Sequence, residues 1–483
     1  MRLRSAAARK PAGGLCARAL LALCLGASAA GAAGLGIPDL GGDALGQAGA
    51  QVASPGNLTA LWYNPAGLMS IDGLLVLQLD PRATWHRVGF QRLTSAGTNP
   101  QGFAPVENGG GISLTSLAPI GGAAWRIPST PVPMVVALGG FPYNGATGYR
   151  YIDPDALRVA GATGRVVQQL APQRYANIFS ANKVYIAALA FAARPLEWLD
   201  LGATFQLVNA SFASKQSVSS GLAQGEDPNL DAQLSLAGHD YGRPSGSFGL
   251  SVHLPHGFDV GLVYQLPYRL HASGTITADL SPALVAAGAA IQGQDARFHL
   301  TLPWFWRAGV RFKGPLFEVE LAATLEGWST YSQVRIVPAD IRFTLGGSTT
   351  QLPEIILQKS LTDTGSVRLG GKLHLGKLSR ALEGLSVSAG MLYEGSAVPS
   401  DRQTLDVAHW ARGAGTLGVG YDTGRWAVFA AYAHFLQPDR QVRDSTVQQV
   451  VALPGTVPTI VGNGDYSSRL DLLSASLLVR FSP

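Results

Sequence analysis

The chain has 483 residues, of which 47% are hydrophobic and 14% charged, and its mean hydropathy is +0.16. Soluble domains carry about 25% charged residues, so this composition disfavours a cytosolic enzyme, and its apolar content excludes a disordered chain. The formal net charge is +5, but residues 1–32 hold five basic residues and no acidic one; the remainder has 36 − 5 = 31 basic against 31 acidic residues, which argues against a nucleic-acid partner.

Residues 1–32 are typical of a secretory signal peptide. A basic region through Arg18 precedes the apolar run Ala19–Leu25, and small residues before Ala33 fit a cleavage site. The alternative is a membrane anchor, but this apolar run is too short to span a bilayer. Both cysteines of the chain lie in this leader, so the exported chain is expected to contain no disulfide and no thiol chemistry.

Residues 33–72 are rich in Gly and Ala and show no strand-like alternation. They contain two apolar runs, 41–50 and 60–68, which are not expected to hang free in water. Two alternatives follow: a plug packed inside a larger structure, where small residues allow close packing, or a flexible leader.

Beyond residue 72, no stretch approaches 18 consecutive apolar residues, which argues against membrane-spanning helices. The other architecture that satisfies every backbone group in lipid is a closed β-barrel. Its signature is a series of roughly 10-residue stretches of alternating polarity. In residues 317–328, for example, an apolar odd-numbered face alternates with Glu318, Glu320 and Glu326.

Fourteen stretches fit this pattern, and an even number is expected of a single-chain bacterial barrel. They lie near residues 73–87, 110–126, 132–143, 177–193, 199–212, 246–254, 258–273, 296–313, 316–337, 364–376, 384–394, 414–421, 425–436 and 469–481. Short connections (314–315, 422–424) alternate with long ones (144–176, 213–245, 437–468). We therefore predict an all-β fold, a 14-stranded antiparallel transmembrane β-barrel over 73–483, with short periplasmic turns and long extracellular loops.

Two connections carry helix signals. Ser281-Pro282 ahead of residues 283–287 is an N-cap followed by proline at the first helical position. Asp153-Pro154 is predicted to begin another short helix toward Leu170. Such helices would either bind an apolar ligand at the mouth of the barrel or simply cap it.

The predicted inward face is partly charged and partly apolar. A two-residue connection at Gly314-Pro315 would place Arg311 opposite Glu318, and an ion pair that braces the wall is favoured over a substrate contact. Stretches 184–192 and 426–435 are apolar on both faces, which predicts a lumen that is packed or that holds an apolar ligand.

Several motifs in chain order resemble those of the FadL family, the Gram-negative outer membrane transporters of long-chain fatty acids and other hydrophobic compounds. Residues 33–72, with Asn64-Pro65-Ala66, resemble the N-terminal hatch of that family and its NPA signature. Residues 302–309 resemble its LP-x-x-W-x-x-G strand start, 326–329 its W-S segment, and 393–399 its Y-x-x-S-P-V-P loop, with Ala397 in place of proline. The chain departs from the family at its end, where Ser482-Pro483 follow the aromatic Phe481.

The resemblance implies a multi-pass β-barrel of the cell outer membrane that acts as a passive transporter and not as an enzyme. Outer loops capture the cargo, with long-chain fatty acids expected ahead of aromatic hydrocarbons, a hatch gates the lumen, and the cargo leaves sideways into the bilayer. Asn64, Pro65 and Ala66 transfer as the hatch motif, whereas the substrate-contacting residues do not transfer. No cofactor and no metal are expected, and the expected partners are outer membrane lipids and the barrel assembly machinery, with the chain itself a monomer.

Two other functions stay open. An outer membrane lipase is disfavoured because no G-x-S-x-G occurs and the nine histidines are scattered, with His253 and His256 too few for a zinc site. A general porin or structural barrel without specific cargo is disfavoured by the apolar inward faces and by the expected hatch. A large open pore would show a stable ion current, and a hatched barrel little.

Overall fold

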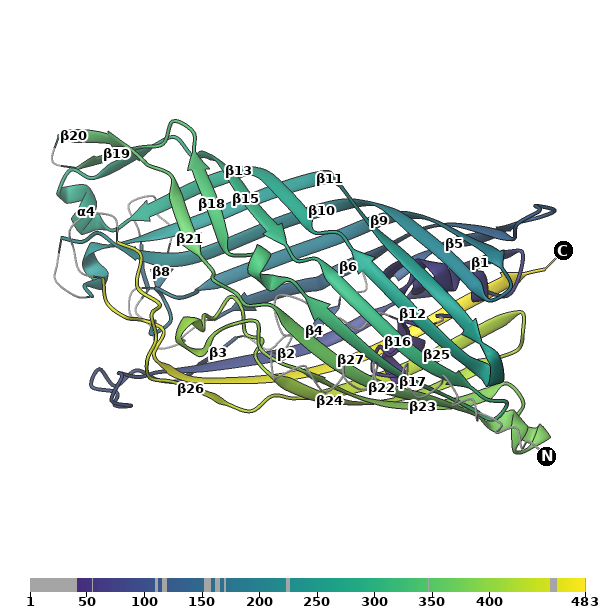
Figure 1. Cartoon of the computed structure of the whole chain (residues 1–483). Coiled ribbons are helices and arrows are strands. Elements are labelled where there is room, and N and C mark those ends of the chain that lie inside the picture. The colour runs from purple at the N-terminus through teal and green to yellow at the C-terminus, as the bar shows by residue number, and fades with distance from the viewer. Residues whose placement is uncertain are drawn as a thin grey trace, which may run out of the picture.

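A closed antiparallel β-barrel forms the body of the protein (Figure 1). The computed structural model describes residues 41–53, 55–108, 112–114, 120–151, 158–160, 166–168, 171–222, 226–345, 347–451 and 458–482. The expected signal peptide therefore lies outside the described residues.

The barrel has fourteen strands, several of them broken into two or three segments. The first seven are β1 (Leu75–Asp80) with β2 (Arg82–Arg92); β3 (Val106–Glu107), β4 (Ile112–Leu114) and β5 (Ile120–Ile127); β6 (Met134–Arg150); β9 (Phe179–Leu196); β10 (Leu199–Ser219); β11 (Asp231–Leu254); and β12 (Phe258–Gln265) with β13 (Tyr268–Leu280). The others are β15 (Asp295–Leu302) with β16 (Phe305–Lys313); β17 (Phe317–Glu326) with β18 (Gln333–Pro338); β21 (Ile355–Gln358) with β22 (Thr364–His374); β23 (Leu385–Glu394); β24 (Arg412–Asp422); β25 (Trp426–Leu436) with β26 (Arg440–Val442); and β27 (Gly464–Phe481).

Each strand pairs with its sequence neighbours, and β27 closes the barrel by pairing with β1 and β2. Leu75 lies opposite Phe481 and Arg92 opposite Gly464, so the last strand runs the full length of the first. The predicted fourteen-stranded antiparallel barrel is therefore confirmed. Closure leaves no free sheet edge, which is the condition for crossing a lipid layer with strands.

The outward face of the wall is apolar. On β17, Phe317, Val319 and Leu321 are exposed while Glu318 and Glu320 turn inward, as the alternation predicts. Large exposed side chains such as Phe205 and Leu417 continue this surface on other strands. An exposed apolar belt of this kind suits hydrocarbon rather than water.

Helices are few and short. Those in residues 41–72 are α2 (Gly42–Gly46), α3 (Ala60–Tyr63) and the 3₁₀ helix η1 (Pro65–Ser70), and the loops hold α4 (Pro282–Ala286), η3 (Pro228–Leu230), η4 (Pro255–Gly257), η5 (Trp328–Thr330), η6 (Leu375–Lys377), η7 (Arg380–Leu382) and η8 (Ser400–Arg402). The predicted cap of α4 is confirmed, because the Ser281 hydroxyl accepts a hydrogen bond from the Leu284 amide at 3.3 Å. None of the described helices is long and apolar enough to cross a membrane.

The predicted helix between Asp153 and Leu170 is wrong where the structure describes this stretch, and its expected start at Asp153-Pro154 lies outside the described residues. Residues 158–160 and 166–168 instead form β7 (Arg158–Ala160) and β8 (Val166–Gln168), which pair antiparallel. The β-branched valines in this stretch favour an extended backbone, and this preference overrides the Asp-Pro start signal. A second small sheet, of β14 (Ala290–Gln292), β19 (Arg342–Leu345) and β20 (Ser348–Gln351), stands at the same end of the barrel (Figure 1).

The predicted long connection 213–245 is also wrong, because β10 and β11 extend far into it. They pair from Leu199↔Val252 to Ser219↔Asp231, which leaves a connection of only 220–230. Beyond the apolar belt both faces of a strand meet polar surroundings, so alternation disappears from the sequence while the hydrogen-bond ladder continues. The other two long connections likewise shorten, because β6 runs to Arg150 and β27 begins at Gly464.

The turn between β16 and β17 shifts the expected register by two residues. Gly314 donates to the Phe317 carbonyl, so the turn centres on Pro315-Leu316 and Arg311 lies opposite Glu320. Arg311 nevertheless forms the expected ion pair with Glu318, at 2.5 Å. A shift of two residues keeps every side chain on its face, so the pairing of faces survives.

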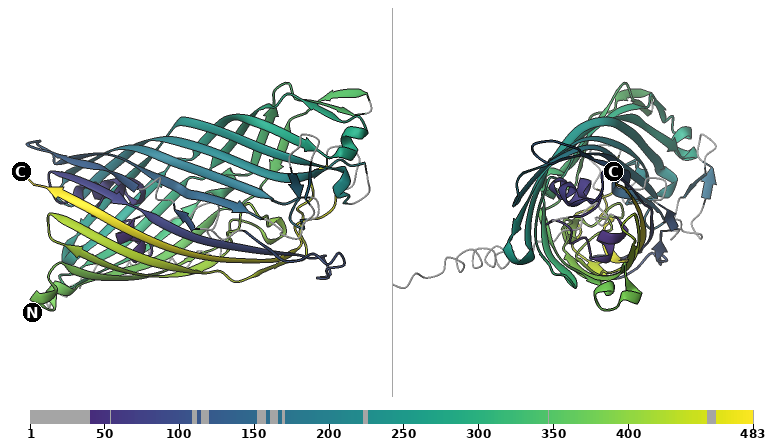
Figure 2. Two further views of the ribbon diagram at one scale, coloured as in Figure 1. Left: turned by 180° about the vertical axis from the view of Figure 1, so that it is seen from behind. Right: turned by 90° about the vertical axis from the view of Figure 1, so that its right-hand side faces the viewer.

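Two segments fill the lumen (Figure 2). Residues 41–72, the luminal segment, lie at the end of the barrel that holds the C-terminus, and their helices are visible inside the ring of strands in the end-on view. Residues 395–411, the inner loop, leave β23 and fold inward toward the other end, where Leu405 packs with Val88 and Tyr151 of the opposite wall. The lumen is thus packed, one of the two alternatives predicted from its apolar faces.

Candidate functional site

The luminal segment is almost entirely buried although it has little regular structure. Of its described residues only Gly56 and Asp72 are exposed. A buried irregular backbone must find hydrogen-bond partners outside itself. The site is therefore best described by the wall side chains that satisfy this backbone.

Asn64 is the most highly connected residue of the segment. Its side-chain oxygen accepts from the Ala66 amide at 3.0 Å and so caps η1, with Pro65 at the first helical position. Its side-chain nitrogen donates to the Val52 carbonyl at 2.7 Å and lies 3.1 Å from both the Leu250 carbonyl and the Ser251 hydroxyl. One amide thus joins two parts of the segment to strand β11.

Pro65 and Ala66 lie directly against the wall at two glycines. A Cβ atom on Gly249 would stand 2.1 Å from Asn64 Oδ1 and 2.9 Å from Pro65 Cδ. A Cβ on Gly202 would stand 2.4 Å from the Ala66 nitrogen. The absence of a side chain at these strand positions is what allows the segment to approach so closely. The three motif residues Asn64, Pro65 and Ala66 are therefore brought together at one seat on β10 and β11.

A single carboxylate holds another turn of the segment. Glu320 Oε1 accepts from the Val52 amide at 2.5 Å and from the Ala53 amide at 3.0 Å, and the Glu320 side chain is buried. A Cβ on Gly261, on the neighbouring wall, would stand 2.2 Å from the Val52 carbonyl oxygen. Charge-assisted hydrogen bonds of this kind are roughly twice as strong as neutral ones.

Cationic wall residues bind the carbonyl groups of the segment. Arg307 donates to the Trp62 carbonyl and Arg368 to the Ala48 carbonyl, both at 3.0 Å. Lys372 pairs with Asp43 at 2.6 Å. Further wall contacts come from Thr416 to Gly46, from Ser476 to Gly42 and from Gln78 to Leu58. The segment is held from most sides of the lumen by contacts that require no strand pairing.

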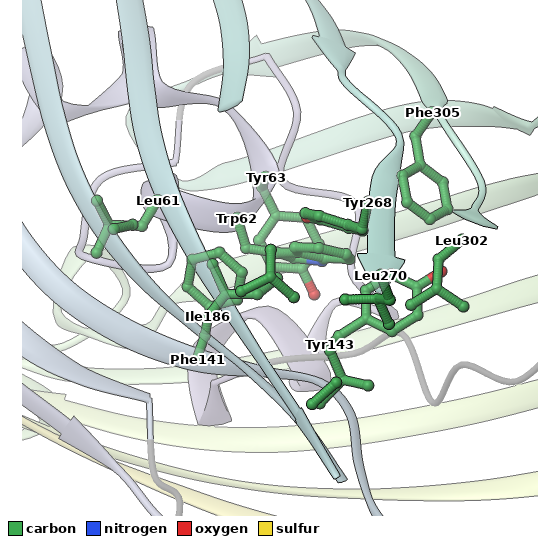
Figure 3. Close-up of a cluster of buried hydrophobic side chains, with 14 of the residues drawn as sticks. Leu61, Trp62, Tyr63, Phe141, Tyr143, Ile186, Tyr268, Leu270, Leu302 and Phe305 are labelled. Carbon is green, nitrogen blue, oxygen red and sulfur yellow. The ribbon is translucent and has the colours of Figure 1, made fainter. Parts of the chain in front are cut away.

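The largest buried hydrophobic cluster of the described residues joins the segment to the wall, and aromatic side chains gather in it around Trp62 (Figure 3). Trp62 of α3 lies with its ring centroid 5.5 Å from that of Phe141 and 6.0 Å from that of Phe305. The rings of Tyr143 and Tyr268 continue the cluster, with their centroids 5.4 Å apart. Leu270 and Leu302 add aliphatic surface at its edge (Figure 3).

The wall beside this cluster is irregular. The register between β6 and β9 shifts between Pro142 and Ala146. Phe141 still pairs with Ile186 of β9, whereas Tyr143 lies directly after the last regular pair, Pro142↔Tyr185. A bulge of this kind re-aims side chains and weakens the local ladder.

Toward the inner loop the lumen becomes charged. Glu394 accepts from Arg368 at 2.6 Å and from Arg412 at 2.8 Å, and all three side chains are buried. Lys359 donates to Asp406 of the inner loop at 2.6 Å. Burial alone would raise the pKa of Asp406, but the charge of Lys359 and hydrogen bonds outweigh it and hold this pKa below its ordinary value. Across the described ranges, no group of three or more His, Cys, Asp or Glu side chains is arranged to hold a metal ion.

Sequence reasoning identified the motif at Asn64 but missed its partners. Glu320 was predicted to face inward, yet nothing in the sequence pairs it with Val52 and Ala53. The one usable signal was glycine within strands, at Gly202 and Gly249, because a glycine there marks close approach of another backbone.

Comparison with known proteins bears on this arrangement. Residues 181–465, more than half of the chain, match the family model described as outer membrane protein transport protein (OMPP1/FadL/TodX). Comparison with curated protein sequences finds no match.

Solved structures share the fold. A Pseudomonas aeruginosa FadL homologue is similar with a TM-score of 0.69 and 14% identity, over 93% of this chain and 100% of that one. The Ralstonia pickettii toluene transporter TbuX gives 0.61 and 14%, over 92% and 99%. The P. putida toluene transporter TodX gives 0.61 and 15%, over 92% and 100%.

The family match covers the wall from within β9 to the start of β27, and the structural matches cover more than nine-tenths of the chain. These agree with the resemblance identified from the motifs. The chain belongs to the OMPP1/FadL/TodX family of outer membrane transport proteins.

Proposed function

We propose that this outer membrane barrel is a passive route for hydrophobic small molecules, gated by its N-terminal segment. The observation that carries the proposal is a lumen closed by a segment that is held through side-chain contacts to its backbone rather than by strand pairing. Such a plug can change position without breaking the wall. In this proposal residues 1–32 are a cleaved signal peptide, 33–72 the hatch and 73–483 the barrel.

The path follows from the distribution of apolar surface. We place the long loops outside the cell, where they capture cargo, and the buried aromatic cluster inside the lumen as the next station. Release occurs sideways through the wall near the β6 bulge, beside Phe141 and Tyr143. An apolar molecule gains roughly 0.8 kcal/mol per CH₂ on leaving water, so the gradient alone drives the transfer and no catalytic step is required.

Two cargo classes are proposed. The family resemblance favours long-chain fatty acids as the cargo. Aromatic hydrocarbons are favoured by a specific observation, namely that the buried cluster beside the segment is built of rings around Trp62. We also propose that the chain acts as a monomer. The alternative function, a general porin without specific cargo, predicts instead a lumen that conducts ions.

The test is uptake of radiolabelled oleate and of toluene by cells that lack their own transporter and express this chain. We expect uptake of at least one compound above that of cells with empty vector, together with low ion conductance of the purified protein in planar bilayers. Conductance typical of an open pore without uptake would replace the proposal with the porin function.

A variant of the hatch motif tests the gating. Asn64→Ala removes the contacts to Val52, Leu250 and Ser251, and we expect it to raise ion conductance. Asn209→Ala is the matched control, because Asn209 bonds to the backbone of Leu207 within the wall strand β10. Equal conductance of both variants and the unmodified protein would argue against hatch gating by this motif.

A further inference from the structure

The indole of Trp62 occupies a box whose sides belong to the wall. Its ring centroid is 5.5 Å from that of Phe141, 6.1 Å from that of Tyr143 and 6.0 Å from that of Phe305. The Arg307 guanidinium carbon lies 4.3 Å from the centroid of the indole. Edge-to-face rings and a cation over the face are the interactions by which proteins bind an electron-rich aromatic ring.

Two phenol groups in this box are buried without hydrogen-bond partners. Tyr143 is 3% exposed and Tyr268 is 0% exposed, and their rings meet edge to face. Within the described part of the chain, neither hydroxyl has a hydrogen-bond partner. Buried tyrosine hydroxyls normally find one, so this pair is poised for an oxygen or nitrogen atom supplied from elsewhere.

Resting on the proposed function, we infer that Trp62 stands in for the cargo. When α3 leaves, the box accepts an aromatic ring in place of the indole, and the hydroxyls of Tyr143 and Tyr268 bind an oxygen on that ring. The cargo class is thus a one- or two-ring aromatic compound that carries one hydrogen-bonding oxygen, such as a phenol.

The surroundings favour a neutral cargo over a carboxylate. Glu326 lies opposite Phe305 in the ladder between β16 and β17, and its carboxylate accepts from the Trp328 indole at 2.5 Å. Arg307, the cation of the box, interacts with Glu326, so the box already holds a cation and its acidic partner, and a neutral cargo leaves that balance unchanged. A long alkyl chain, for its part, offers no flat face to Arg307.

The inference also couples binding to the gate. The indole and the cargo ring cannot occupy the box together, so binding of the cargo competes with docking of α3. Asn64 follows Trp62 by two residues, so withdrawal of the indole pulls on the seat at Gly249. By mass action, cargo then shifts the segment toward its undocked position.

The test compares p-cresol and toluene, which share a ring and a methyl group and differ by one hydroxyl, with oleate as a third ligand. Binding to the purified full-length barrel is measured by equilibrium dialysis in detergent. We expect p-cresol to bind about tenfold more tightly than toluene, because a site built to hydrogen-bond a hydroxyl discriminates against the analogue without it. Equal affinities would overturn the inference.

Variants identify the groups responsible. Tyr143→Phe combined with Tyr268→Phe should remove the preference for p-cresol over toluene, because both hydroxyls are lost while both rings stay. Trp62→Ala should raise the affinity for both compounds by vacating the box. The matched control is Trp306→Ala, since Trp306 lies on the outward face of the strand that carries Arg307. Heat-modifiable migration on gels confirms that each variant is folded.

The outcomes separate the inference from the proposed function. Binding of oleate or toluene without preference for p-cresol would overturn the inference and leave the proposed function in place. Loss of p-cresol binding in the Trp62→Ala protein would overturn the idea that the indole competes with cargo. Failure of all three ligands to bind the folded barrel would overturn both.

Discussion

The two segments that fill the lumen are held by different chemistry. In the luminal segment, residues 41–72, wall side chains bind backbone groups, as Glu320 binds the amides of Val52 and Ala53. The inner loop, residues 395–411, is held by pairs of charged side chains, as when Asp406 of the loop binds Lys359 from outside it. Backbone contacts of this kind let most of the luminal segment consist of small residues and still dock in one place, and the side chains of Asn64 and Trp62 add to them.

Their attachment to the chain differs as well. The inner loop is tied at both ends to the wall, at Glu394 of β23 and Arg412 of β24. The luminal segment continues directly into the wall where β1 begins at Leu75, and the chain before residue 41 lies outside the described residues. The loop is therefore restricted to local rearrangement, whereas the segment can undock as a unit once its side-chain contacts are lost. Under the proposed function, gating therefore falls to the segment and narrowing of the lumen to the loop.

The largest effect is expected from Glu320→Ala. Loss of the carboxylate leaves the Val52 and Ala53 amides buried without an acceptor, which weakens docking of the segment by about 3 kcal/mol. Single-channel conductance should rise, and cells expressing the variant should become sensitive to large antibiotics such as vancomycin. Glu318→Ala is the control, because Glu318 shares the strand and face but pairs with Arg311 and His374 of the wall. Equal leakage of the two variants would show that the segment is held elsewhere.

The next effect is expected from Gly249→Ala. The added methyl carbon would stand 2.1 Å from Asn64 Oδ1, so the motif cannot stay seated on β11, and docking weakens by roughly 2 kcal/mol. Conductance should rise, by less than in Glu320→Ala. Gly415→Ala serves as control because nothing lies within 4 Å of its added carbon. Unchanged conductance in Gly249→Ala would contradict the glycine seat.

The strand that carries Glu320 shows what the sequence can and cannot predict about this barrel. The strands and their faces were predictable because one face meets an apolar surrounding, so that Phe317 and Glu318 separate by polarity alone. The register of the turn at Pro315 was not predictable, because a turn that slides by two residues leaves every side chain on the same face. The partner of Glu320 was not predictable either, since it binds backbone amides, which carry no residue-specific signal.

The luminal segment was recognisable only through a motif. Its Gly and Ala residues carry no periodicity, because its contacts come from many wall strands and follow no repeat. Only residues 393–399 of the inner loop could be identified from the sequence, through their family resemblance. The burial of the loop depends on contacts of Leu405 and Trp410 with strands that are distant in sequence. The aromatic box is assembled in the same way, from Trp62, Phe141 and Phe305, and no local pattern could have identified it.

A smaller and local effect is expected from Asp406→Asn in the inner loop. The change leaves the charge of Lys359 without its partner in a mostly buried site, which weakens packing of the loop by about 1–2 kcal/mol. Trypsin should then cut after Arg402 faster, while ion conductance changes less than in Glu320→Ala. Asp401→Asn is the control within the loop, because Asp401 lies 3.9 Å from Arg402 and is more exposed. A conductance change as large as that of Glu320→Ala would give the loop a gating role and break the comparison.

The smallest effect is a pH dependence of the inner loop. The pKa of Asp406 is below its ordinary value, so its contribution is fully present above the ordinary pKa of about 4 and is lost as pH falls through the lowered value. Hydrogen exchange of residues 395–411, corrected for the intrinsic rate, should therefore accelerate in acid. Replacing the pair by Lys359→Met and Asp406→Leu should abolish the pH dependence, because no titrating group then remains at this contact. Equal acceleration in that variant would place the acid-sensitive contact elsewhere in the lumen, and would mean that the Lys359–Asp406 pair does not distinguish the loop from the segment.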